Sequence, residues 1–94
     1  MPLDDRKLTA AALLRERAAT HGDFHSVAWV AQELRRVYRH ELGWEALSPI
    51  QREALDSMAS KVGRILSGDP NFADHWSDLC GYATLALNEI NEPK

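Results

Sequence analysis

Apolar residues recur at helical spacing along almost the whole chain, and no segment alternates with the period of two that a half-buried strand shows. This periodicity predicts helices and no sheet. The first helix is expected from about Asp5 or Thr9 to Thr20, with Gly22 in the position where a left-handed residue ends a helix. Because the connections between the expected helices are short, neighbours should pack antiparallel. The predicted fold is an all-α, small antiparallel bundle of about four helices, a single domain over residues 1–94.

The second helix is expected from Phe24 or Ser26 to Glu41, and one of its sides is apolar. That side carries Val27, Val30, Ala31, Leu34 and Tyr38. Trp29 points away from it by more than a quarter turn, so another helix or a partner chain must cover that tryptophan. We favour self-association, with the bundle completed by oligomerisation.

The second half of the chain predicts two further helices. Ser48 should cap the third, since Pro49 follows it and Gln51 completes a capping box. This helix is expected to end at about Ser67, before Gly68, and the fourth to run from Asn71 to Asn91. The expected buried residues are Leu55, Met58, Ala59, Val62, Ile65 and Leu66, then Trp76, Leu79, Ala83, Ala86, Leu87 and Ile90.

Composition narrows the possible functions. The net charge is -3 and the 11 basic residues are dispersed, which disfavours binding to duplex nucleic acid. The single cysteine, Cys80, excludes an intrachain disulfide, and its place beside an apolar stripe predicts a small core residue. No apolar run is long enough for a membrane span, and no signal-peptide pattern is visible, so we expect a cytoplasmic protein with no membrane partner.

The charged residues around the last predicted turn suggest a ligand site. Asp74 and Asp78 lie four residues apart on the fourth helix, so their carboxylates can reach a common ion such as magnesium. Alternatively, Asp74 offsets the helix dipole and Asp78 is solvated. Lys61 and Arg64 share one side of the third helix, where they could grip phosphate oxygens or simply favour the carboxyl end of that helix.

A second acidic pair, Glu53 and Asp56, lies on the third helix. Asp56 falls beside the apolar stripe and Glu53 nearly opposite it, so Asp56 is the better candidate for a metal ligand. Tyr82 lies one turn beyond Asp78, where its ring could stack on a base or pack against a neighbouring helix.

Histidines offer a further metal hypothesis. His21, Asp23, His25 and His75 could be combined into a transition-metal site. However, His21 and Asp23 fall in a turn, where Asp23 is expected to cap the second helix instead.

Four sequence segments carry a resemblance to a group of small phage-associated proteins of uncharacterised function. It spans about residues 15 to 90 and rests on His21 to Phe24, Arg52 to Asp56, Lys61 to Leu66 and Asp74 to Ala83. The resemblance implies a chain encoded by a phage or prophage and located in the cytoplasm of a bacterial host. It implies no activity.

The second half also resembles the MazG-type all-α nucleoside triphosphate pyrophosphatases, in which acidic pairs on successive helices hold Mg²⁺ against the substrate triphosphate. The aspartate of the later family motif matches Asp78, whereas His75 stands where the motif has its first acid and Asp74 lies one residue earlier. Glu53 and Asp56 are the only residues that can be laid onto the earlier glutamate cluster. The resemblance therefore implies a magnesium-dependent enzyme that cleaves the phosphoanhydride of a nucleotide.

Residue roles follow from that resemblance. Asp56, Asp74 and Asp78 would hold Mg²⁺, and Glu53 would orient the attacking water as the catalytic residue. Lys61 and Arg64 would bind phosphate.

A chain this short would complete such a site only by pairing, so a homo-oligomer is expected. Two other functions stay open: a nucleotide-binding relative that has lost turnover, and a non-enzymatic helical module that binds other proteins.

Overall fold

The computed structural model describes the backbone of residues 5–93 and the side chains of residues 9–93, and these residues form helices and no strand. The elements are α1 (Asp5–His21), α2 (Phe24–Arg39), a short 3-10 helix η1 (Leu42–Ala46), α3 (Pro49–Ser67) and α4 (Ala73–Asn91). The all-α prediction is therefore confirmed. The 3-10 helix was not anticipated.

The helix ends follow the local sequence signals. Asp23 caps α2 by accepting a hydrogen bond from the Ser26 amide (3.3 Å). Ser48 and Gln51 form both halves of a capping box at the start of α3. Gly22 follows α1 with a φ of 79°, a conformation that L side chains rarely adopt. These boundaries match the sequence predictions.

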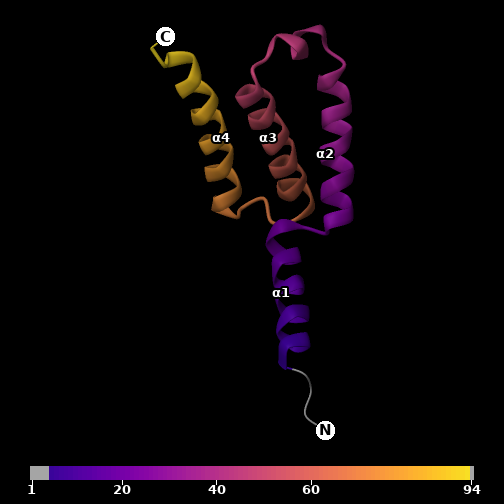
Figure 1. The fold of residues 1–94 in the computed structure, drawn as a ribbon. Coiled ribbons are helices and arrows are strands. Elements are labelled where there is room, and N and C mark those ends of the chain that lie inside the picture. Colours follow the sequence, from indigo (N-terminus) through magenta and orange to yellow (C-terminus); the bar gives the residue numbers. More distant parts are fainter. Residues whose placement is uncertain (1–4, 94) are drawn as a thin grey trace.

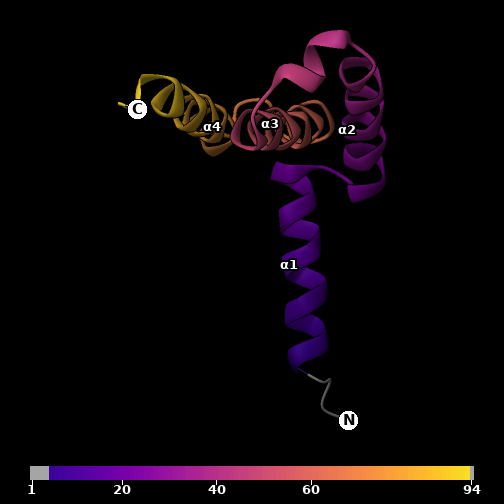
Figure 2. The ribbon, with the colours of Figure 1, turned by 45° about the horizontal axis from the view of Figure 1, so that its top comes forward.

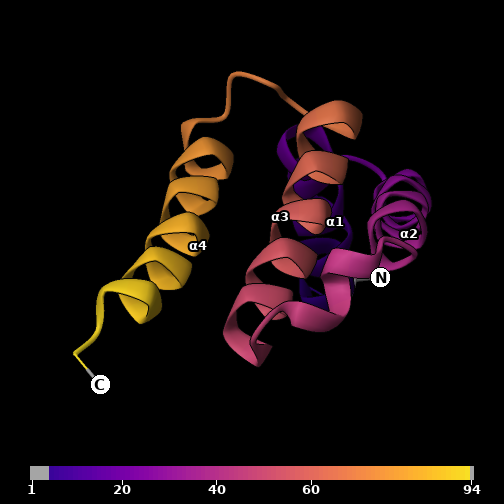
Figure 3. The same ribbon diagram turned by 90° about the horizontal axis from the view of Figure 1, so that it is seen from above.

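Three of the helices make one layer. In Figures 1 and 3, α3 lies between α2 and α4, and each neighbour runs antiparallel to it. In contrast, α1 does not lie along this layer. It projects from the end where α3 stops and α4 begins, as Figures 1 and 2 show. The principal extents of 64 × 29 × 23 Å reflect this projecting helix.

The buried core is carried by α2 and α3, and it consists mainly of small residues. Its buried members are Val27, Ala31, Ala54, Ala59, Gly63 and Ile65. The two helices approach so closely that a Cβ atom at Gly63 would lie 2.7 Å from the Val27 carbonyl oxygen. Small residues at the crossing permit this approach.

Several large side chains that we predicted to be buried are exposed. On α3, Leu55 and Leu66 are 37% and 70% exposed. On α4, Trp76, Leu87 and Ile90 are each more than half exposed. The reason is the single layer: among the described helices, α4 packs extensively against α3 alone, so much of its apolar side is uncovered. Cys80 is also exposed, which corrects its prediction as a core residue.

The turn after α1 is tied to the turn before α4. The Thr20 carbonyl oxygen accepts a hydrogen bond from the Asp69 amide (3.0 Å). It also lies 2.9 Å from His75 Nε2. His75 is fully buried, with its ring against those of His21 and Phe72. A Cβ atom at Gly68 would lie 2.4 Å from the same carbonyl oxygen. This junction fixes the end of α1 on the layer.

Trp29 is 65% exposed, as its position off the apolar side of α2 predicted. Among the helices of the described chain, none is both long and apolar enough to cross a membrane.

Candidate functional site

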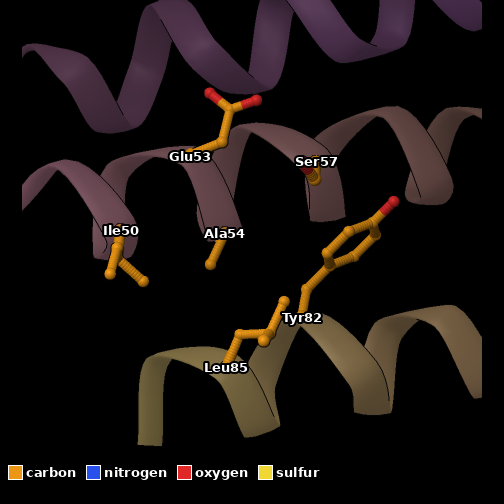
Figure 4. A pocket seen from close by; sticks show the side chains of 6 residues that line it. All are labelled: Ile50, Glu53, Ala54, Ser57, Tyr82 and Leu85. Atoms are coloured by element: carbon orange, nitrogen blue, oxygen red, sulfur yellow. The ribbon is translucent and has the colours of Figure 1, made fainter. Parts of the chain in front are cut away.

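Two grooves meet beside α3. The first is apolar, has a volume of about 300 Å³ and is lined by Ile50, Glu53, Ala54, Ser57, Tyr82 and Leu85. Figure 4 shows Ile50 and Ala54 of α3 facing Leu85 and the Tyr82 ring of α4, whereas the Glu53 carboxylate points away from them. We call this the apolar groove.

The second groove is polar and has a volume of about 310 Å³. It shares Glu53, Ser57 and Tyr82 with the apolar groove and adds Arg17, Arg35, Asp56, Ser60, Lys61 and Arg64. Its four cationic side chains face two carboxylates, so it carries a formal excess of two positive charges in a chain whose net charge is -3. We call this the polar groove. Its charge favours an anionic ligand.

Asp56, a predicted metal ligand, is engaged with α2. Its carboxylate accepts hydrogen bonds from the Tyr38 hydroxyl (2.5 Å) and from Arg39 Nη2 (2.7 Å). Burial alone would raise the pKa of Asp56, but these hydrogen bonds and the nearby positive charges hold that pKa below its usual value. Burial, followed by the hydrogen bond with Asp56, raises the pKa of Tyr38 to about 12. Asp56 is therefore an ionised, already neutralised carboxylate.

Arg35 links this network to the polar groove. Its Nη2 donates hydrogen bonds to the Asp56 carbonyl oxygen (2.7 Å) and to Ser60 Oγ (2.8 Å). Its Nε lies 3.6 Å from Asp56 Oδ1, which is too long for a hydrogen bond. That Nε is buried and has no acceptor among the described residues. Because this Nε is buried, Arg35 contributes the positive charge of its guanidinium to the groove rather than a free donor.

Lys61 and Arg64 both line the polar groove, as their predicted phosphate role requires. Lys61 Nζ lies 2.7 Å from Asp78 Oδ2, and the Lys61 side chain is only 15% exposed. The hydrogen bond from Lys61 is the main cause that lowers the pKa of Asp78. The Arg64 guanidinium has no hydrogen-bond or ion-pair partner among the described side chains. Arg64 is thus available to an incoming anion.

The predicted magnesium ligands do not form one cluster. Among the side chains of residues 9–93, no three of the His, Cys, Asp and Glu types are arranged to hold a metal ion. Asp74 is exposed in the first turn of α4, Asp78 contacts Lys61, and Asp56 faces α2. Glu53 is exposed at the edge of both grooves. The magnesium site built from these residues stays a prediction, and the residues described do not by themselves fit it.

Three residues of the predicted transition-metal site, His21, Asp23 and His75, have structural roles. Asp23 caps α2, as expected, and His75 packs at the junction. The Nδ1 of His21 is 2.6 Å from the hydroxyl of Thr20. Burial, followed by the positive charge of Arg17, lowers the pKa of His21. These residues serve the helix connections.

Sequence reasoning missed four residues of the polar groove, namely Arg17, Arg35, Ser57 and Ser60. Arg35 and Ser60 could have been noticed because each lies on the helix side that faces the neighbouring helix. Arg17 could not, since its place depends on the direction in which α1 leaves the layer. Tyr82 lines both grooves, so its ring can serve a ligand as well as packing.

Comparison of the chain with protein-family models, with curated proteins and with solved structures finds no match. The functional argument therefore rests on the two grooves and on the chemistry of their side chains.

Proposed function

We propose that the chain binds a nucleotide, with the phosphates in the polar groove and the base in the apolar groove. The observation that carries this proposal is that the two grooves share lining residues. A groove with an excess of two positive charges adjoins an apolar groove, and Tyr82 and Ser57 line both. A nucleotide has the same two parts, an anionic chain joined to a flat, largely apolar ring. Stacking on an aromatic side chain suits any base.

The cations have distinct roles in this proposal. Arg64 is the first phosphate contact, because it has no ion pair to give up. Arg35 is held in place by Ser60 and by the Asp56 backbone, so its positive charge is fixed beside the groove before the ligand arrives. Lys61 contributes only if the phosphate displaces Asp78 from its ammonium.

Binding without turnover is the form that the geometry supports best. Hydrolysis by a MazG-type mechanism would need carboxylates that converge on magnesium, and the described residues bring no such group together. The pyrophosphohydrolase hypothesis, with Mg²⁺ at Asp56, Asp74 and Asp78 and with Glu53 as the catalytic residue, is the alternative that the same experiment tests.

The experiment is a calorimetric titration with a panel of nucleoside mono- and triphosphates, first in EDTA and then in Mg²⁺. Replacing Arg64→Gln should weaken binding by about tenfold, the usual worth of one hydrogen bond to a charged group. Arg36→Gln is the matched control, since Arg36 is exposed on α2 and pairs only with Glu33. No binding of any nucleotide, or equal losses in the two variants, would refute the proposal.

Tyr82→Leu separates the two grooves. It should weaken nucleotide binding by about tenfold, because one stacking contact is lost, and weaken binding of inorganic triphosphate much less, because Tyr82 carries no charge. Pyrophosphate release is measured in the same samples. Magnesium-dependent release that Asp78→Asn abolishes, with the bundle still folded, would establish the hydrolytic alternative instead.

A second function, a non-enzymatic protein-interaction module of phage or prophage origin, is favoured by a different observation. Large apolar side chains are exposed on every helix, among them Leu14, Trp29, Leu66 and Leu87. Such a module would bind no nucleotide, so the titration also distinguishes the two functions.

A further inference from the structure

The chain exposes much more surface than a compact protein of its mass. Its accessible area is 7184 Å², whereas a folded monomer of 10.6 kDa is expected to expose about 5,500 Å². Its radius of gyration is 17.1 Å, against about 12.4 Å for a compact domain of this length. The excess area is about 1,700 Å². A stable interface of standard size buries about 800 Å² on each partner, so the excess is large enough for one.

Much of this excess comes from α1. The helix leaves the layer at one end and runs out into solvent, as Figures 1 and 2 show. Leu13 and Leu14 are 57% and 69% exposed on it. Its 17 residues are close to the length at which an isolated helix is marginal in water. Packing against another surface would therefore stabilise α1.

A suitable surface lies in the angle between α1 and α2. There, Leu14 and Ala18 of α1 and Phe24 of α2 line a groove of about 520 Å³, with Arg17 and Arg64 along its edge. Phe24 is 73% exposed. We call this the hinge groove. It is continuous with the exposed apolar side of α1, since Leu14 belongs to both.

We propose that a second copy of this chain covers α1 and the hinge groove, in a two-fold symmetric dimer in which each α1 packs against its counterpart and enters the partner's hinge groove. Exposed leucines on a projecting helix and an uncovered groove lined by Leu14, Ala18 and Phe24 occur in the same chain, so two copies can cover each other and close the assembly. The excess area of each chain, about 1,700 Å², exceeds the roughly 800 Å² per partner that a standard interface buries, so it leaves room for such a contact. This proposal does not depend on the nucleotide proposal.

The dimer would also adjoin the polar groove. Arg17 and Arg64 line both the hinge groove and the polar groove. A partner seated in the hinge groove would therefore form a boundary of the anion site and limit its exposure to water.

The test is the mass of the full chain in solution, measured by sedimentation equilibrium from 1 to 100 μM. We expect a dimer. Leu14→Lys should raise the dissociation constant at least about 100-fold, because a charged group would have to be buried at the contact. Leu87→Lys is the matched control: this leucine is 53% exposed on α4 and lies outside the hinge groove. It should leave the dimer intact.

Two further measurements keep the proposal open to refutation if Leu14→Lys fails to fold. Phe24→Lys should dissociate the dimer from the other side of the hinge groove, and circular dichroism reports whether each variant stays helical. A wild-type chain that is monomeric at 100 μM would overturn the proposal and point to a different protein as the occupant. A dimer that Leu87→Lys dissociates and Leu14→Lys does not would place the contact elsewhere and overturn it too.

Discussion

Replacing Asp56→Asn should destabilise the fold and strengthen anion binding at the same time. Asparagine keeps the size of the side chain and removes its charge. The hydrogen bond from the Tyr38 hydroxyl then loses its charged acceptor, which costs about 1.5 kcal/mol. The ion pair with Arg39 adds only about 0.5 kcal/mol, because Arg39 is 45% exposed and solvent screens it. A total of about 2 kcal/mol corresponds to a melting temperature roughly 10 °C lower.

The same change raises the positive excess in the polar groove from two charges to three, since Asp56 is one of its two carboxylates. At a separation of about 6 Å in water, one unit charge changes the binding energy of a singly charged anion by about 0.7 kcal/mol. Phosphate binding in EDTA should therefore tighten about threefold. A role for Asp56 as a magnesium ligand predicts the opposite for a magnesium nucleotide, namely weaker binding.

Thermal unfolding followed by circular dichroism, together with calorimetric phosphate titration, measures both effects. Glu53→Gln is the control, because Glu53 lines the same groove but is exposed and forms no ion pair among the described residues. It should tighten phosphate binding by a similar factor and leave the melting temperature within about 2 °C. An unchanged melting temperature in Asp56→Asn, or weaker phosphate binding in EDTA, would refute this reasoning.

Three other outcomes are expected. The pKa of Asp56 is lowered in the fold, so its stabilisation is complete above its usual pKa of 3.8 and is lost as the pH falls through the lower folded value. The difference in urea unfolding between wild type and Asp56→Asn should therefore be constant well above pH 3.8 and shrink as the pH falls below it. Gly22→Ala should destabilise the fold by more than 1 kcal/mol in thermal unfolding, because its φ is positive and its Cβ would lie 2.6 Å from Ser67. Gly81→Ala is the control: its Cβ would enter open space, so it should stabilise the helix by about 0.5–1 kcal/mol. His75→Ala should cost about 3 kcal/mol in urea unfolding, since it removes a fully buried ring and the contact with Thr20.

Much of the fold is readable from local sequence. The limits of α2 and α3 depend on Asp23, Ser48 and Gln51, whose side chains bond to amides within three residues. Such signals need no knowledge of the rest of the chain. The same is true of the positive φ at Gly22.

The packing could not be read in the same way. A helical projection shows which side of α3 is apolar, and its prediction of burial is confirmed for Ala59 and Ile65. It was wrong for Leu55 and Leu66, and it did not show that α3 approaches α2 most closely at Gly63. The role of His75 was missed for a related reason, because its burial requires the α1 and α4 ends to meet.

The candidate site was partly predicted. Lys61 and Arg64 line the polar groove, as their spacing on one helix side indicated. The spacing of Asp56 could not show that Tyr38 and Arg39 would already occupy its carboxylate, because those partners lie 17 and 18 residues away on another helix.

The Thr20 carbonyl oxygen has a consequence for how the chain unfolds. It contacts the Asp69 amide and His75 Nε2, so a single peptide group joins segments about 50 residues apart. If the α1 end moves away, both the Asp69 amide and His75 Nε2 lose their common partner, the Thr20 carbonyl oxygen. The amino-terminal end of α4 and the carboxyl-terminal end of α1 should therefore come apart as one cooperative unit rather than fray separately.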